Sequence, residues 1–135
     1  MARYTVLIDG RSGAYGVVVP DLPGCVAMGA TIEEAVDHVA DAMRDWAEAT
    51  EGQGGTVPAP RPIEVLRREA DVAAGLAAGA SLASVPLVRE TGRPVKANLS
   101  LDAGILDALD AEASRLKLTR SALVEVMAKR MLARG

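Results

Sequence analysis

Residues 95–102 read Val-Lys-Ala-Asn-Leu-Ser-Leu-Asp, and this stretch sets the architecture of the C-terminal part of the chain. Apolar residues alternate there with Lys96, Asn98 and Ser100, a period of two that predicts a β-strand with one polar face. Two helical patterns follow, so the segment from residue 95 onward contains one short strand and two helices. Its 41 residues are too few to bury a core of their own, and the unit therefore requires a second copy of itself.

Both predicted helices begin at a capping residue. Asp102 can cap the first helix and Thr119 the second. The lone strand before them leaves its backbone groups unpaired, and antiparallel pairing with the same strand of a second chain satisfies them. We therefore expect a homodimer formed through residues 95–135.

A two-stranded ribbon of this kind fits the major groove of B-DNA. Lys can donate to guanine, Asn can bond adenine, and Ser can serve either base, which makes the polar face suitable for base recognition. The start of the last helix, Thr119-Arg120-Ser121, offers free N–H groups, two hydroxyls and a guanidinium for a phosphate. The competing interpretation is a dimerisation arm whose polar strand face is simply solvated.

The N-terminal part has a different pattern. Two β-rich runs around a glycine-containing loop predict a hairpin, and a short third strand follows the turn at Pro23-Gly24. Thr31 and Glu34 have the spacing of a capping box at the start of a long amphipathic helix, which is expected to end near Thr50. The expected elements are strands 4–8, 15–19 and 25–28, a helix from 32 to about 50, a helical region over 63–78 and a strand over 82–88.

Residues 90–94 are polar and turn-rich, and they mark a domain boundary. We expect an N-terminal β-β-β-α-α-β domain over residues 1–90, a linker over 91–94 and the strand-helix-helix unit over 95–135, which together make an α+β protein. Within the long helix, Ile32, Val36, Val39, Met43 and Trp46 form the expected apolar stripe.

The charge differs between the two parts. The formal net charge is −3, but residues 1–94 hold 8 Lys and Arg against 13 Asp and Glu, whereas residues 95–135 hold 7 against 5. An acidic N-terminal part suits a basic protein partner, and a mildly basic C-terminal part suits DNA. Aromatic residues make up 2% of the chain, which disfavours base stacking on single strands.

Cys25 is the only cysteine, so an intramolecular disulfide is impossible and a reducing compartment is expected. We find no signal-peptide pattern and no apolar run long enough to span a membrane, and we therefore expect a cytoplasmic protein.

The residues do not indicate an enzyme, a metal site or a cofactor. A two-metal nuclease needs several converging carboxylates, and Asp9 is the one candidate at a strand end. His38 has no partner pattern for a metal or an acyl-transfer site. A degenerate nuclease that uses Asp9 with helix carboxylates is the enzymatic alternative, and a turn residue is the simpler interpretation of Asp9.

The C-terminal unit resembles the ribbon-helix-helix family of DNA-binding proteins. Residues 95–102 match its strand and first helix cap, and Leu-Thr-Arg-Ser-Ala-Leu at 118–123 matches the turn into its second helix. The resemblance implies that Lys96, Asn98 and Ser100 read bases. It also implies that the backbone amides of residues 119–121 anchor phosphates.

Residues 15–35 carry a second resemblance, which points to a more specific family. Their Pro-Asp-Leu-Pro-Gly-Cys core, at 20–25, and the Thr31 helix start resemble the HicB antitoxin family. The resemblance implies a partial RNase H-like N-terminal domain that binds and masks a small basic HicA toxin, an mRNA-cleaving ribonuclease with a double-stranded-RNA-binding-like fold. It implies that the C-terminal domain represses the shared operon. The candidate toxin-binding residues are Asp21, Leu22, Glu33, Asp37 and Asp41.

The Ala/Gly-rich segment over 63–80 departs from the family pattern as a longer helical insert. The expected function is an antitoxin that also represses its own operon, with further association through the N-terminal domains as an additional step. The alternative is a ribbon-helix-helix repressor whose N-terminal domain senses a small ligand.

Overall fold

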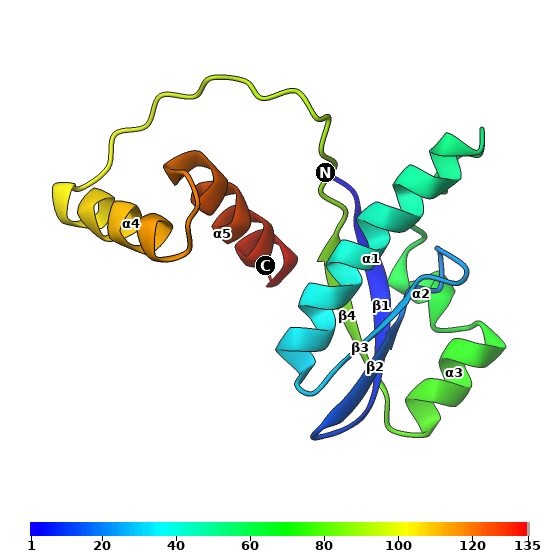
Figure 1. The fold of residues 1–135 in the computed structure, drawn as a ribbon. Helices are drawn as coiled ribbons and strands as arrows, with labels where there is room; N and C mark the ends of the chain where they lie inside the picture. Colours follow the sequence, from blue (N-terminus) through cyan, green and yellow to red (C-terminus); the bar gives the residue numbers. More distant parts are fainter. Residues whose placement is uncertain (135) are drawn as a thin grey trace. The chain divides into compact units, whose positions relative to one another are not determined.

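The computed structural model describes residues 1–134 (Figure 1). They divide into two compact units, one formed by residues 1–89 with 132–134 and the other by residues 90–131. The α+β class is confirmed, because four strands form one antiparallel sheet alongside five helices. In chain order the elements are β1 (Arg3–Arg11), β2 (Ala14–Val18), β3 (Val26–Gly29), α1 (Ile32–Gly52), α2 (Ile63–Leu66), α3 (Ala70–Ala77), β4 (Ser81–Pro86), α4 (Ala103–Arg115) and α5 (Arg120–Arg134).

The sheet has the strand order β3-β2-β1-β4, so β3 and β4 are its edges. The predicted hairpin is present, but β1 continues past Ile8 to Arg11 and includes Asp9 opposite Gly16. The turn needs only two residues, and Gly10 adopts a φ of 102° that lets the pairing continue. Asp9 is therefore a strand residue and not the turn residue that its Asp-Gly context indicates.

Helix α1 covers one face of the sheet. Tyr4, Val6 and Ile8 of β1 point to this face and form the core together with Val39 and Met43 of the helix. The buried stripe of α1 consists of Ala35, Val39, Ala40, Met43 and Ala47. Ile32, which the apolar pattern places in this stripe, is exposed.

The start of α1 lies very close to the end of β3. This close approach explains why the buried stripe of α1 begins at Ala35 and does not include Ile32. A Cβ built on Gly29 would lie 2.4 Å from the backbone nitrogen of Ala35, so only small residues fit at this contact. Thr31 caps the helix, because its Oγ1 accepts a hydrogen bond from the Glu34 N–H at 3.1 Å. The return bond from the Glu34 side chain is not among the hydrogen bonds of residues 1–134, so the capping box is half formed.

The opposite face of the sheet is covered only in part. Leu7 points to this face because it alternates with Val6 and Ile8, and a Cβ on Gly75 of α3 would lie 2.8 Å from a Leu7 methyl carbon. The expected helical region over 63–78 is two short helices, because Glu69 adopts an extended backbone conformation between them. Helices α2 and α3 leave the β2 and β3 half of this face open to solvent.

The second unit contains α4 and α5 up to Met131, and both predicted caps are present. Asp102 Oδ1 accepts from the N–H groups of Gly104 and Ile105 at 2.8 and 3.2 Å. Thr119 Oγ1 accepts from the Ala122 N–H at 3.1 Å. The strand expected over residues 95–101 does not form in the single chain, where the segment is irregular and exposed. A strand exists only in a ladder, and the described residues offer this segment no second strand.

None of the helices described over residues 1–134 combines the length and the hydropathy needed to cross a membrane.

Candidate functional site

The extended segment 95–101 exposes both of its faces. Lys96, Asn98 and Ser100 are solvent-exposed, as expected for base-reading residues. The intervening apolar residues are exposed as well, with Val95 at 87% and Leu99 at 68% of their full accessible surface. Clustered exposed apolar side chains of this kind are typical of an interaction surface.

A groove of about 480 Å³ separates this segment from α4 and α5 of the same unit. Its walls combine apolar and polar side chains from the segment and from the two helices. The apolar ones are Val95, Ala97, Leu99, Leu101, Leu106 and Val124, and the polar ones are Asn98, Arg120, Ser121 and Glu125.

The predicted phosphate-binding residues lie together at the start of α5. Thr119, Arg120 and Ser121 are all exposed there. Arg120 already has a partner, since its guanidinium donates to both carboxylate oxygens of Asp110 at 2.7 and 2.8 Å. The same hydrogen bonds hold the pKa of Asp110 below its usual value. A phosphate that binds Arg120 must therefore compete with Asp110, a constraint that the sequence did not reveal.

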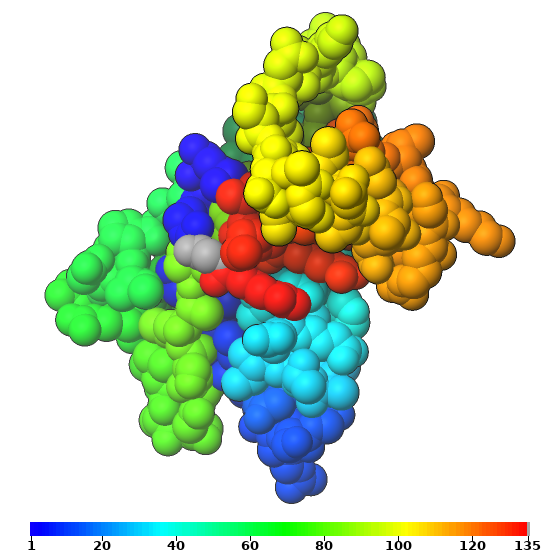
Figure 2. All heavy atoms as spheres, turned by 90° about the vertical axis from the view of Figure 1, so that its left-hand side faces the viewer, coloured from blue at the N-terminus to red at the C-terminus, as the bar shows by residue number. Residues whose placement is uncertain are grey.

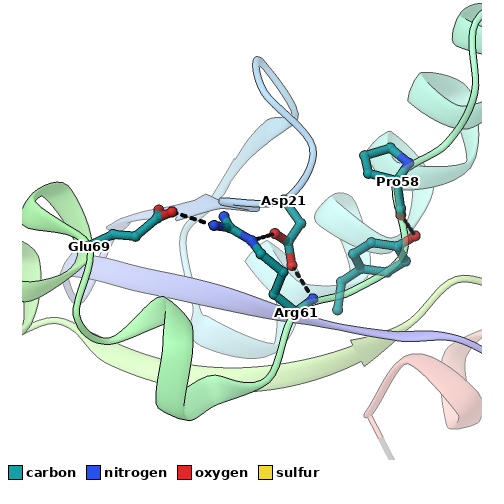
Figure 3. A network of polar contacts seen from close by, with 5 residues as sticks. Asp21, Pro58, Arg61 and Glu69 are labelled. Carbon is teal, nitrogen blue, oxygen red and sulfur yellow. Dashed lines mark hydrogen bonds and ion pairs between the residues drawn. The ribbon is translucent and has the colours of Figure 1, made fainter.

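Asp21 and Leu22, two of the expected toxin-binding residues, are buried in this conformation, so they are not available on the surface of residues 1–134. Asp21 Oδ2 accepts from the backbone N–H of Arg61 at 2.9 Å, and Oδ1 accepts from Arg61 Nε at 2.6 Å (Figure 3). Arg61 also donates to Glu69, and the Tyr4 hydroxyl donates to the carbonyl of Pro58.

This polar network connects the turn between β2 and β3 to the proline-rich segment that leads into α2. Arg61 and Glu69 could not be predicted as partners of this site, because they lie 40 and 48 positions after Asp21 and no local pattern joins residues at such separations. The arrangement gives Asp21 a role in the fold: its carboxylate binds the backbone and the side chain of Arg61 and so fixes the proline-rich segment before α2.

The other three expected toxin-binding residues lie on α1. Glu33 and Asp41 are exposed, and Asp37 is half-buried. Within the first unit, the Arg134 guanidinium lies 3.2 Å from an oxygen of Asp37 and 3.9 Å from one of Glu33. Of the three, Asp41 alone lies on the stripe of α1 that runs beside β3.

We call that stripe the acidic stripe; all its residues are exposed and share one side of the helix. Its members are Glu34, His38, Asp41, Asp45 and Glu48. The His38 Nδ1 lies 2.6 Å from the Met28 carbonyl oxygen of β3, so Nδ1 carries the proton and donates. Figure 2 shows the first turns of α1 (cyan) at the surface next to the β1–β2 hairpin (blue).

Cys25 is buried. Its burial is the main cause, and the nearby negative charge of Asp45 the second cause, of a thiol pKa raised to about 11. Because the thiolate is the reacting species, we expect native Cys25 to react with a disulfide reagent at pH 8 about 100-fold more slowly than a free cysteine. Absorbance of the released thiolate measures the rate. In denaturant the rate should rise to that of a free thiol, and a fast native reaction would show that the site opens.

The described residues contain no group of three or more His, Cys, Asp or Glu side chains that could hold a metal ion. Asp9 stands beside Gly16 on the strand and joins no such group.

Comparison with known proteins defines the class. Residues 4–128 match the family model described as HicB-like antitoxin of bacterial toxin-antitoxin system. The chain belongs to the HicB-like antitoxin family, which confirms the resemblance seen in residues 15–35. It is thus an antitoxin of a toxin-antitoxin system, and since the family consists of non-enzymatic regulators, the expectation that it is not an enzyme is confirmed.

The chain is similar to the antitoxin HicB of Burkholderia pseudomallei, with 27% identity, a TM-score of 0.56 and coverage of 98% of this chain and 99% of that one. A structure described as the HicA3 and HicB3 toxin-antitoxin complex shares the fold at 19% identity and a TM-score of 0.53, over 65% of this chain and 98% of that one. UPF0150 protein Ta0767 of Thermoplasma acidophilum is 34% identical over 64 residues, which are 47% of this chain and 93% of that protein.

Proposed function

We propose that this protein masks a HicA-type ribonuclease toxin through its first unit and represses its own operon through a dimer of its second unit. The observation that carries the repressor part is the segment 95–101, whose apolar and polar faces are both exposed in the single chain. Water can satisfy the backbone groups of this exposed segment, but its apolar side chains stay in contact with water, and such clustered exposed apolar residues are typical of an interaction surface.

Pairing of two copies of this segment would form a two-stranded ladder and allow its apolar side chains to be covered. The apolar residues would close over α4 and α5 of the two chains, and the polar residues would form the outer face of a two-stranded ribbon. This is the ribbon-helix-helix arrangement, in which Lys96, Asn98 and Ser100 of both chains face the major groove. The capped starts of the two α5 helices would then supply phosphate contacts.

The masking part rests on family membership and on charge. HicB-like antitoxins act in toxin-antitoxin systems, and a structure of the same fold was determined in complex with a HicA toxin. We assign the first unit to a partial RNase H-like fold, with a β-β-β-α-α-α-β order in which two short helices replace the second expected helix. Its excess of carboxylates along α1 is complementary to a small basic toxin.

Co-purification tests the function directly. The short basic protein encoded next to this chain's gene is expected to bind the full chain and to lose its ribonuclease activity in the complex. A chain that lacks the first 90 residues should still bind operator DNA but should not bind the toxin. Failure of the full chain to bind or neutralise that protein would contradict the antitoxin proposal and favour a repressor that senses a small ligand.

Base reading by the strand predicts a selective defect in the Asn98→Ala variant. Removing the amide should lower specific operator affinity by about 30-fold or more, since a good bidentate contact contributes on the order of 1–3 kcal/mol of discrimination and two chains each lose one. Binding to unrelated DNA should change little. Gel-shift titrations on both DNAs measure the two affinities.

The Arg120→Ala variant is the matched comparison, because Arg120 contacts phosphate in this proposal. It should weaken specific and non-specific binding alike and should lower the salt dependence of binding. Equal losses on both DNAs in Asn98→Ala would show that the strand does not read bases.

A further inference from the structure

The outer edge of β3 is open and faces solvent. Val19 N–H donates to the Cys25 carbonyl at 3.1 Å, which makes Val19 and Cys25 a hydrogen-bonded pair of the β2–β3 ladder. Hydrogen-bonded and non-bonded pairs alternate along an antiparallel ladder, and the register joins Val18 to Val26 and Gly16 to Met28. The N–H and C=O groups of Val26 and Met28 therefore point away from β2.

One of these four outward groups is already engaged. The Met28 carbonyl accepts the hydrogen bond from His38 of α1, which leaves the Val26 N–H, the Val26 C=O and the Met28 N–H facing outward. Three backbone groups in a row on an edge strand are a template for another strand.

The side chains on this strand strengthen that template. Val26 and Met28 are 57% and 67% exposed, and the neighbouring Val18 of β2 is 42% exposed. They lie on the sheet face that α2 and α3 leave uncovered. No residue of β3 is charged, so an added strand would meet an apolar surface continuous with the sheet.

The negative charge beside the outer edge of β3 determines which kind of partner can pair with it. The acidic stripe runs along β3, as the His38 contact with Met28 and the influence of Asp45 on Cys25 both show. A second copy of this unit paired at β3 would bring two acidic stripes toward each other, and like charges would oppose that pairing. A strand from a basic protein would place its cations beside the stripe instead.

We infer that β3 is a strand-addition site, at which an extended segment of a basic protein partner joins the sheet as a fifth strand with its cationic side chains along the acidic stripe. The inference rests on the proposed function, in which the partner is the toxin. Main-chain hydrogen bonds would supply affinity that does not depend on the partner's side chains, and the stripe would supply selectivity for a basic partner.

Amide hydrogen exchange on the unmodified full chain tests this inference. The probe is the short basic protein expected to be encoded next to this chain's gene, in a variant that lacks ribonuclease activity. We expect the amides of Val26 and Met28 to exchange at least 10-fold more slowly in the complex than in the free protein. Stable binding without added protection at these two amides would overturn strand addition and leave masking intact, whereas absence of binding would contradict the proposed function itself.

A pair of variants tests the same site independently. Val26→Pro removes an outward N–H at the first residue of an edge strand, where proline is tolerated, and Val26→Thr keeps that N–H with a similar shape. Binding should weaken at least 10-fold in the proline variant and less than 3-fold in the threonine variant, as measured by calorimetric titration. Circular dichroism and operator binding serve as controls for folding.

Equal binding by the two Val26 variants would overturn the inference. Protection of the Val26 and Met28 amides that rises with the concentration of the free chain alone would also overturn it, in favour of a second copy at this edge.

Discussion

Replacing Leu99 by lysine is expected to convert the protein from a dimer to a monomer and to reduce specific operator binding by more than 100-fold. Leu99 is 68% exposed in the single chain, and in the proposed ribbon its side chain would pack between the two copies. A lysine there would place two like charges in an apolar interface, and burying an unpaired charge costs several kcal/mol. Because the ribbon forms only in the dimer, loss of dimerisation removes the DNA-binding surface as well.

The neighbouring position provides the control for the Leu99→Lys variant. In the proposed ribbon the side chain of Asn98 would face away from the interface between the two chains, so Asn98→Ala should remain dimeric while losing specificity for the operator. Sedimentation equilibrium measures the mass of both variants, and gel shifts measure their operator affinity. A dimeric Leu99→Lys protein with normal operator binding would show that the apolar side of segment 95–101 does not form the interface.

The Leu22→Ala variant should lower the free energy of unfolding of the first unit by about 3 kcal/mol. Leu22 has no accessible surface and belongs to the cluster that packs between the sheet and α1. Truncation of a fully buried leucine removes its transfer free energy and leaves a cavity, which together cost about 2–5 kcal/mol. Urea unfolding followed by circular dichroism measures the change.

Val65→Ala is a suitable control for the Leu22 experiment. Val65 is 45% exposed on α2, and its truncation should change the free energy of unfolding by less than about 1 kcal/mol. Toxin binding measured below the unfolding transition then separates the two roles considered for Leu22. Normal affinity in folded Leu22→Ala indicates a core residue, and a loss of affinity in the folded variant would make Leu22 a toxin contact that the conformation described here conceals.

Local signals predicted most of the elements correctly. The hairpin, the Thr31 cap and the caps at Asp102 and Thr119 each depend on residues within a few positions of one another, and the structure contains all of them. The half-formed capping box and the exposed Ile32 show the limit of such signals. A helix pattern gives the width of the apolar face, but the contact between Gly29 and Ala35 decides which residues of that face meet the sheet.

The residues proposed to bind DNA remain predictions from the sequence, which rest on local patterns: the alternation over residues 95–101 and the helix start at Thr119. The candidate toxin contacts were harder to predict, because exposure depends on elements that are distant in the chain. Asp21 follows a strand and precedes a turn, which is typical of a surface residue, yet Arg61 covers it from 40 positions away. The open edge of β3 could not be predicted from local patterns either, because the order of the strands depends on which of them pair in the folded sheet.

Sequence alone was sufficient for the division into an acidic and a mildly basic part, for the helix caps and for the family, because composition and short spacings carry that information. The tertiary structure decided which carboxylates are buried, which face of the sheet stays uncovered and which strand edge is open. These features depend on contacts between residues far apart in the chain, and the free energy of such contacts is set by packing that no local pattern encodes.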